Sequence, residues 1–462
     1  MISEATNERG AAPLRVAAPF AHEGVSLRTA SLRLDQAPPI DVPFRFFLTA
    51  PLFLLAAAAV VLWSGPGALE SRGSPAALAA THLVTLGFML MVMLGALMQM
   101  LPVIAGAPVP HTRSAAAITH AALALGVTAL ATGFLLGQAV LFKTAAWLLG
   151  LALAVFLIAV SVALARATAR NVTVNGIKLA VVALAITGSL GLTLAAVHDW
   201  GVPLAYLTIR TLHPVWGVLG WTGLLVASVA FQVVPMFQMT PQYPAAMAGW
   251  FPATAFLLLA AWSTVVWTVP ESKIQVALTL GMAGTAGLFS ITTLVLQHRR
   301  RRRQADATII FWRLGMACAC AACIAWAARM VLPSPPEALD VAIGVLALAG
   351  FAVSVIDGML YKIVPFLAWF HLQDVVGART TPHMKKILPD RSQHLHARMH
   401  IVAITLLLVA LVWSPALYIA ALAFGASAVI LLRNLLIAAR LYHVQVGVRR
   451  ERGTSRYNHP IS

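Results

Sequence analysis

Residues 87–102 read GFMLMVMLGALMQMLP, and the same pattern returns as GWTGLLVASVAFQVVP at 220–235 and as GFAVSVIDGMLYKIVP at 350–365. In each copy, a glycine followed by an aromatic residue precedes a proline by 15 residues. The copies recur about every 130 residues, which is too long for the units of a solenoid. We therefore predict three repeated blocks, each of which gives one equivalent helix to a shared membrane interior.

The composition is that of a membrane protein. Sixty per cent of the 462 residues are apolar and only 10% are charged, too few charges to solvate a globule of this size. Because about 20 apolar residues cross the ~30 Å of hydrocarbon in a bilayer, apolar runs can be counted as candidate spans. They lie near 44–63, 76–103, 115–138, 140–165, 176–197, 206–237, 246–268, 274–297, 309–332, 339–370, 397–413 and 415–441.

The predicted fold is therefore an all-α membrane protein with twelve transmembrane helices in three pseudo-repeated four-helix blocks. The patterned helix is the second of each block, so that helices 2, 6 and 10 are counterparts. The blocks cover about 43–165, 176–297 and 309–441 of a membrane domain at 43–441. Residues 1–42 are polar and lack a signal peptide, and we predict that they form a flexible cytoplasmic arm. Residues 442–462 are predicted to be a basic cytoplasmic tail.

Lys and Arg residues concentrate in the loops after helices 4, 8 and 10 and in the tail. By the positive-inside rule these loops and both termini face the cytoplasm, which predicts a multi-pass protein of a bacterial-type cytoplasmic (inner) membrane. The loops account for much of the net charge of +17. Attraction to an anionic inner leaflet explains that charge, so the lipid bilayer is the expected partner and nucleic acid is not.

Two histidines lie at similar depth in counterpart helices. His82 of helix 2 precedes its glycine by five residues and His213 of helix 6 by seven. That offset is about 200° of helix rotation, so a shared site needs a local distortion, for which His213-Pro214 is a candidate. Neutral imidazole is a ligand for haem iron, copper or zinc, and the alternative is two histidines that pack against backbone carbonyls. Arg210, one turn from His213, is either a partner for a haem propionate or an interfacial cation.

Helix 10 carries ionisable residues well inside the hydrocarbon. Asp357 and Tyr361 are four residues apart and share one helix face. Lys362 aligns with Gln99 and Gln232 across the three repeats. We predict that these five residues form a polar interior, which serves either as a proton or solute path or as a cluster that fixes helix packing.

Histidines also gather near the predicted cytoplasmic loop after helix 10, at His371, His383, His394, His396 and His400. His396 and His400 have the i,i+4 spacing that can chelate a metal, and the alternative is that they are solvated surface residues. The cysteines of helix 9 (Cys318, Cys320 and Cys323) are interpreted as small packing residues. The methionines of helix 2 (Met89, Met91, Met93, Met98 and Met100) suit either Cu(I) passage or packing.

Twelve helices in three blocks around helices 2, 6 and 10 resemble subunit I of the haem-copper oxidases. The stretch from His213-Pro214-Val215-Trp216-Gly217 to Gln232-Val233-Val234-Pro235 is similar to helix 6 of divergent members, including the NnrS-type membrane proteins associated with nitric-oxide stress. The resemblance implies that His82 is the haem ligand of helix 2 and that His213 corresponds to a copper ligand. It covers all twelve helices in layout, but its motifs are specific only in helices 2 and 6.

The chain departs from the oxidase pattern, since 246–268 and 339–356 contain no histidine, and we do not expect oxygen reduction. Three functions stay open. The first is a haem- or copper-binding protein that handles electrons or nitric oxide. The second is a permease for a small solute or copper that has lost its cofactors. The third is an accessory or assembly factor that binds components of a respiratory oxidase. Whether the chain is an enzyme is left open by the sequence.

Overall fold

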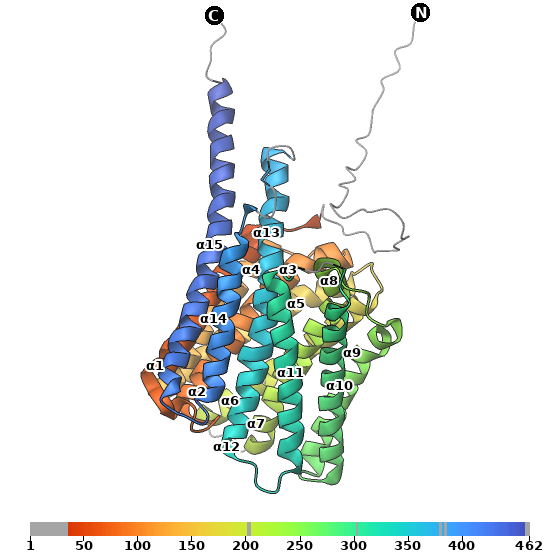
Figure 1. The fold of residues 1–462 in the computed structure, drawn as a ribbon, viewed down its shortest axis with the longest axis vertical. Helices are drawn as coiled ribbons and strands as arrows, with labels where there is room; N and C mark the ends of the chain where they lie inside the picture. The colour runs from red at the N-terminus through yellow and green to blue at the C-terminus, as the bar shows by residue number, and fades with distance from the viewer. Residues whose placement is uncertain (1–35, 201–204, 302–303, 378–380, 383–385, 458–462) are drawn as a thin grey trace, which may run out of the picture. The chain divides into compact units, whose positions relative to one another are not determined.

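The computed structural model describes residues 36–200, 205–301, 304–377, 381–382 and 386–457, and every regular element in these ranges is helical. In chain order (Figure 1) they are α1 (Asp41–Ser64), η2 (Gly65–Ala68), α2 (Pro75–His82), η3 (Leu83–Leu90), α3 (Met91–Ala105), α4 (Thr112–Leu136), α5 (Ala139–Ala165), α6 (Val172–Trp200), α7 (Tyr206–Val215), η4 (Trp216–Gly223), α8 (Leu224–Gln238), α9 (Ala245–Thr268), α10 (Lys273–His298), α11 (Ala307–Val331), α12 (Glu337–Val345), η5 (Leu346–Val353), α13 (Ser354–Val376), α14 (Asp390–Val409) and α15 (Ala416–Tyr457).

Within the described residues, eleven helices are long and apolar enough to cross a membrane. The prediction of an all-α, multi-pass membrane protein is confirmed at this level. The predicted eleventh span, 397–413, corresponds to α14, which begins earlier and is not among the eleven because its first half is polar. The predicted basic tail, 442–462, is helical as far as Tyr457, where it continues α15. Most of the predicted arm, 1–35, and residues 458–462 lie outside the described residues.

Each of the three repeated stretches contains a π-helical segment at the same position. The segments η3, η4 and η5 have eight residues each, and each begins four residues before the repeated glycine. They join α2 to α3, α7 to α8 and α12 to α13, which gives three composite helices that we call the first, second and third inner helices. Because π-helical turns are rare, their recurrence in one register supports the threefold repeat.

The repeated glycines let the first helix of each block lie directly on its inner helix. A Cβ atom would clash with a side chain of that neighbouring helix at Gly87 and Gly350 and would be tightly packed against it at Gly220, so the close approach favours glycine. Such a Cβ would lie 2.5 Å from Phe53 Cβ of α1 at Gly87, 3.1 Å from Ala183 Cβ of α6 at Gly220 and 2.7 Å from Cys318 Cβ of α11 at Gly350. The aromatic residue that follows each glycine is buried in all three copies.

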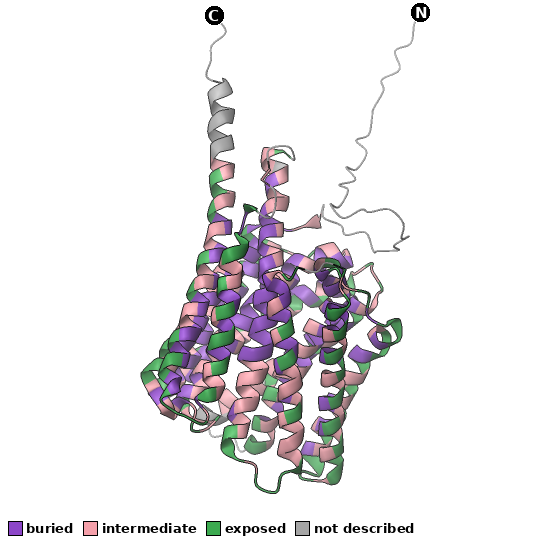
Figure 2. Cartoon of the chain, in the orientation of Figure 1, coloured by how far each residue is buried: buried purple, intermediate pink, exposed green. Residues whose placement is uncertain are grey.

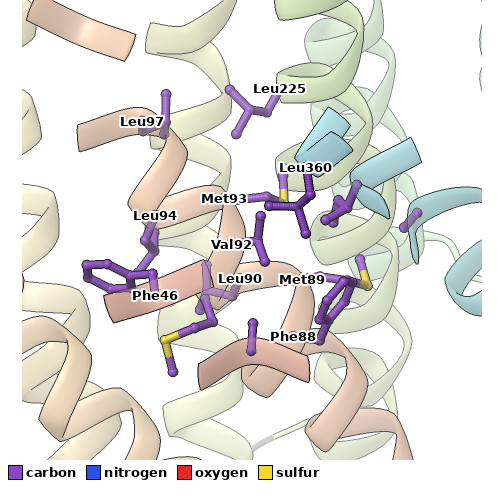
Figure 3. Close-up of a cluster of buried hydrophobic side chains, with 14 of the residues drawn as sticks. Phe46, Phe88, Met89, Leu90, Val92, Met93, Leu94, Leu97, Leu225 and Leu360 are labelled. Atoms are coloured by element: carbon purple, nitrogen blue, oxygen red, sulfur yellow. The ribbon is translucent and has the colours of Figure 1, made fainter. Parts of the chain in front are cut away.

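The three inner helices share the core, as predicted. Segment η5 contacts both η3 and η4. Figure 3 draws Met93 of the first inner helix, Leu225 of the second and Leu360 of the third within one cluster of buried apolar side chains. Met93 and its neighbour Met89 therefore belong to this apolar core. Figure 2 shows that burial is greatest around the π segments and α3, α8 and α13, and lower where α7 and α12 begin.

Candidate metal centre and buried polar cluster

His82 and His213 occupy equivalent places at the start of the first and second inner helices. Each is the eighth residue of its α-helical segment, since α2 begins at Pro75 and α7 at Tyr206. Ser74 fixes the start of α2 because its Oγ accepts a hydrogen bond from Ala77 N, 3.1 Å away. The matched depth predicted from the sequence therefore follows from where the two helices begin.

The two imidazole rings lie beside each other. Their centroids are 6.3 Å apart and their planes differ by only 14°. His82 Nδ1 donates to the Leu78 carbonyl at 2.8 Å, and His213 Nδ1 donates to the Thr187 carbonyl at 3.1 Å. A neutral imidazole that carries its proton on Nδ1 presents a lone pair on Nε2. Both rings are therefore held in the tautomer that binds a metal through Nε2.

The surroundings of the pair place it where the first and second blocks meet. The centroid of the His82 ring lies 5.2 Å from that of the Phe134 ring of α4. His213 turns toward α6, where it bonds to Thr187 and lies against Gly191, at which a Cβ would be 2.9 Å from the imidazole Cε1. The two-residue offset between His82 and His213 thus does not keep the rings apart, because the His213 side chain turns toward α6. Pro214 lies inside α7, and the π-helical segment η4 begins two residues after it, at the same register as η3 and η5.

Arginines surround the same end of the bundle. The guanidinium of Arg210 lies over Gly73, since a Cβ there would be 2.9 Å from its Nη2. The adjacent Arg72 is 3.8 Å from the carboxylate of Asp340, which also forms an ion pair with Arg329. Arg72 and Arg329 are thus both paired with Asp340, and Glu70 and Glu337 lie at the same end. Sequence reasoning found only Arg210, because the other arginines meet through the tertiary contact between the first and third blocks.

This pair can provide two nitrogen ligands to one metal. The two rings are neighbours, with centroids 6.3 Å apart, and the Nε2 lone pair of each is available to a ligand. His82 and His213 would hold a haem iron or a copper ion through these nitrogens, and either metal would supply one-electron redox chemistry. A structural zinc needs four protein ligands, and the described residues contain no group of three or more His, Cys, Asp or Glu side chains that could hold a metal. The third inner helix adds no ligand, since Ile343 and Val345 stand at the corresponding positions.

A second cluster joins residues that the sequence had put in two separate groups. Asp357 and Tyr361 of α13 meet His396 and His400 of α14, and all four side chains are at most 4% exposed. The interpretation of His396 and His400 as solvated is therefore wrong. Chelation by the two is not supported either, because both nitrogens of His400 are engaged, by Ser354 at 3.0 Å and by Ser427 at 3.4 Å.

The remaining polar residues predicted for the interior have different settings. The Lys362 ammonium is 2.9 Å from the carboxylate of Asp306, which caps the N-terminus of α11. Gln99 is buried and Gln232 is half-buried. No hydrogen bond or ion pair in the described part of the chain links Gln99, Gln232 and Lys362. These three aligned residues therefore do not form one connected polar group.

Burial raises the cost of ionising Asp306, yet the Lys362 charge and hydrogen bond hold the pKa of this carboxyl below its usual range.

Of the other histidines, His394 is half-buried beside the loop before α11, and His383 lies outside the described residues. Cys318 packs against Gly350, in agreement with its interpretation as a packing residue.

Compared with known proteins, the sequence matches no protein-family model and no curated protein. The fold and the two polar sites are therefore the basis for the function.

Proposed function

We propose that this chain is a twelve-helix membrane protein related to subunit I of the haem-copper oxidases, and that His82 and His213 hold one haem iron or copper ion. The observation that carries the proposal is the near-parallel pair of imidazoles, 6.3 Å apart, contributed by counterpart helices. The proposed role is in electron transfer or nitric-oxide handling. Oxygen reduction is not proposed, because the helices that follow lack the additional histidines of an oxidase.

The protein groups around the pair fit this role. The Leu78 and Thr187 carbonyls orient the two rings, and such partners normally fix the tautomer of a metal-binding histidine. Arg210, whose guanidinium lies over Gly73 at this end of the bundle, would pair with a carboxylate of a haem. A bound haem iron or copper ion would supply one-electron redox chemistry. The two histidines bind and orient it, and the apolar packing of Phe134 limits access of water to one side.

The twelfth span in this proposal is α14. It packs against α15, α11, α12 and η5, so its polar face with His396 and His400 is buried by protein and does not meet lipid. A polar helix can cross a membrane when its polar groups face the bundle interior. The basic loops after α5, α10 and α13 follow the fourth, eighth and tenth spans and so share one side, which the positive-inside rule assigns to the cytoplasm. With α14 counted as a span, the C-terminal end of α15 lies on that side too.

The decisive experiment measures iron and copper in the detergent-purified protein, together with its visible absorption spectrum before and after reduction. We expect about one metal per chain, with an intense visible band if the metal is haem iron. His82→Ala and His213→Ala should each lose the metal, and the matched control His443→Ala, on the exposed part of α15, should retain it. Wild-type protein without either metal, or metal content unchanged in both histidine variants, would refute the proposal. Solute uptake into vesicles by a metal-free protein would favour the permease instead.

A further inference from the structure

The buried cluster between α13, α14 and α15 is independent of the histidine pair and has a feature of its own. Asp357 is 1% exposed, and neither of its carboxyl oxygens has a hydrogen-bond partner in the described structure. Its nearest ionisable neighbour is His396, whose Nε2 is 3.6 Å from Oδ2, too far for a hydrogen bond. An unpartnered carboxyl inside a membrane protein indicates a function.

The hydrogen bonds around Tyr361 determine which nitrogen of His396 carries its proton. Asn434 Nδ2 donates to the Tyr361 hydroxyl at 2.8 Å, and that hydroxyl is 2.8 Å from His396 Nδ1. The arrangement that uses every donor has Tyr361 donating its O–H to Nδ1. Asn434 is held in this orientation because its Oδ1 accepts from Ser392 Oγ at 2.6 Å. The neutral imidazole then carries its proton on Nε2, which faces Asp357.

This arrangement leaves Asp357 without a compensating charge. If His396 is neutral, an ionised Asp357 would be an isolated buried carboxylate, which is far costlier than a neutral carboxyl. The other helix that packs here, α11, offers the rings of Phe311 and Trp312, both fully buried.

The remaining ionisable neighbours do not provide that charge either. Lys362, the nearby cation of α13, is held by Asp306. His400 of α14 is hydrogen-bonded to serines, and α15 contributes Asn434 and Ser427, which are uncharged.

We propose that Asp357 is a proton-binding site within the membrane domain, and that His396 supports the state in which the proton has left. At rest the carboxyl keeps its proton, because no neighbouring charge compensates a carboxylate there. On release, the O–H bond of Asp357 breaks, the proton passes to water, and the imidazole Nε2–H closes the 3.6 Å gap to the carboxylate. The site lies about one helical turn from η5, where Ser354 links His400 to the start of α13. The proposal does not depend on a metal at His82 and His213.

Infrared difference spectroscopy of the purified protein between neutral and alkaline pH tests the proposal. We expect a protonated-carboxyl band at neutral pH that disappears on alkalinisation, is missing in Asp357→Asn and persists in the control Asp306→Asn. His396→Ala, which removes the Nε2–H, should move the midpoint of this titration to higher pH. His396→Gln, which keeps an N–H donor, should move it less. A wild-type spectrum without the band, or a band unaffected by Asp357→Asn, would overturn the proposal.

A second measurement needs no variant and so does not depend on whether Asp357→Asn folds. Carbodiimides react with protonated carboxyls in apolar surroundings, so the wild-type protein should be labelled at Asp357, as read by mass spectrometry, with labelling lost at alkaline pH. Labelling elsewhere but not at Asp357 contradicts the proposal. Metal analysis provides a further check, because a metal lost in both Asp357→Asn and His396→Ala but kept in His82→Ala would show that the cluster binds a metal instead of a proton.

Discussion

The repeated glycines give the sharpest test of the fold. Alanine at Gly87 would place a Cβ 2.5 Å from Phe53 Cβ and 2.7 Å from Phe53 Cδ1, about 1 Å inside the usual 3.5–4.0 Å contact. Phe53 is 8% exposed and cannot move into solvent, so α1 must shift away from the first inner helix. Overpacking of this kind costs about 1–3 kcal/mol, and we expect Gly87→Ala to lie in the upper half of that range.

The same reasoning predicts a graded series. Gly350→Ala should cost nearly as much as Gly87→Ala, because it meets Cys318 Cβ at 2.7 Å, which is fixed to the backbone. Gly220→Ala should cost less, since its closest atoms are 3.0 Å away. The matched control is Gly344→Ala in the third inner helix, where nothing lies within 4 Å and the higher helix propensity of alanine adds up to about 1 kcal/mol of stability.

Unfolding of the detergent-solubilised variants by titration with dodecyl sulfate gives the free-energy differences. If Gly87→Ala is as stable as Gly344→Ala, the close contacts between the first helix of each block and its inner helix are not present, and our account of the repeated glycine is wrong.

Two further predictions concern the sites. Gly191→Ala should displace the His213 ring and lower the metal content of the purified protein. The control Gly188→Ala, on the same helix, meets only the end of a flexible leucine side chain and should retain the metal. Equal metal content in the two variants would contradict the placement of His213. The pKa of Asp306 is lower in the folded protein than in the unfolded chain. Its ion pair with Lys362 therefore stabilises the fold fully above about pH 4, the pKa range of an aspartate in the unfolded chain. This contribution is lost as the pH falls through the pKa of Asp306 in the folded protein. Asp306→Asn keeps the helix cap but should remove this acid-side fall in the thermal unfolding midpoint, and an unchanged fall would assign it to another group.

Much of the fold could be predicted because the evidence for it is local in the sequence. Apolar runs of sufficient length identify helices in any membrane protein, and the pattern from Gly87 to Pro102 and its two copies identified the inner helices. The π-helical segments were not predicted, since no residue type in them specifies an extra residue per turn. The extent of α14 was missed because its polar first half, from Asp390 to His400, resembles a solvated loop unless its partners are known.

The candidate sites could be predicted from the sequence only in part, because they depend on contacts between helices. The depth of His82 and His213 follows from residue position, but their approach depends on the direction in which each helix faces. His213 lies beside His82 because it packs on Gly191 of α6. Helix periodicity in the sequence does not predict this contact between helices.

Hydrophobic length and glycine spacing act along one chain segment at a time, and they were enough to identify a multi-pass helical protein with three repeated inner helices. Packing between helices was needed to bring His82 beside His213, Arg72 to Arg329 at Asp340, and His396 beside Asp357. Each of these pairs joins segments separated by well over thirty residues, and their side chains meet because packing between helices sets their rotation.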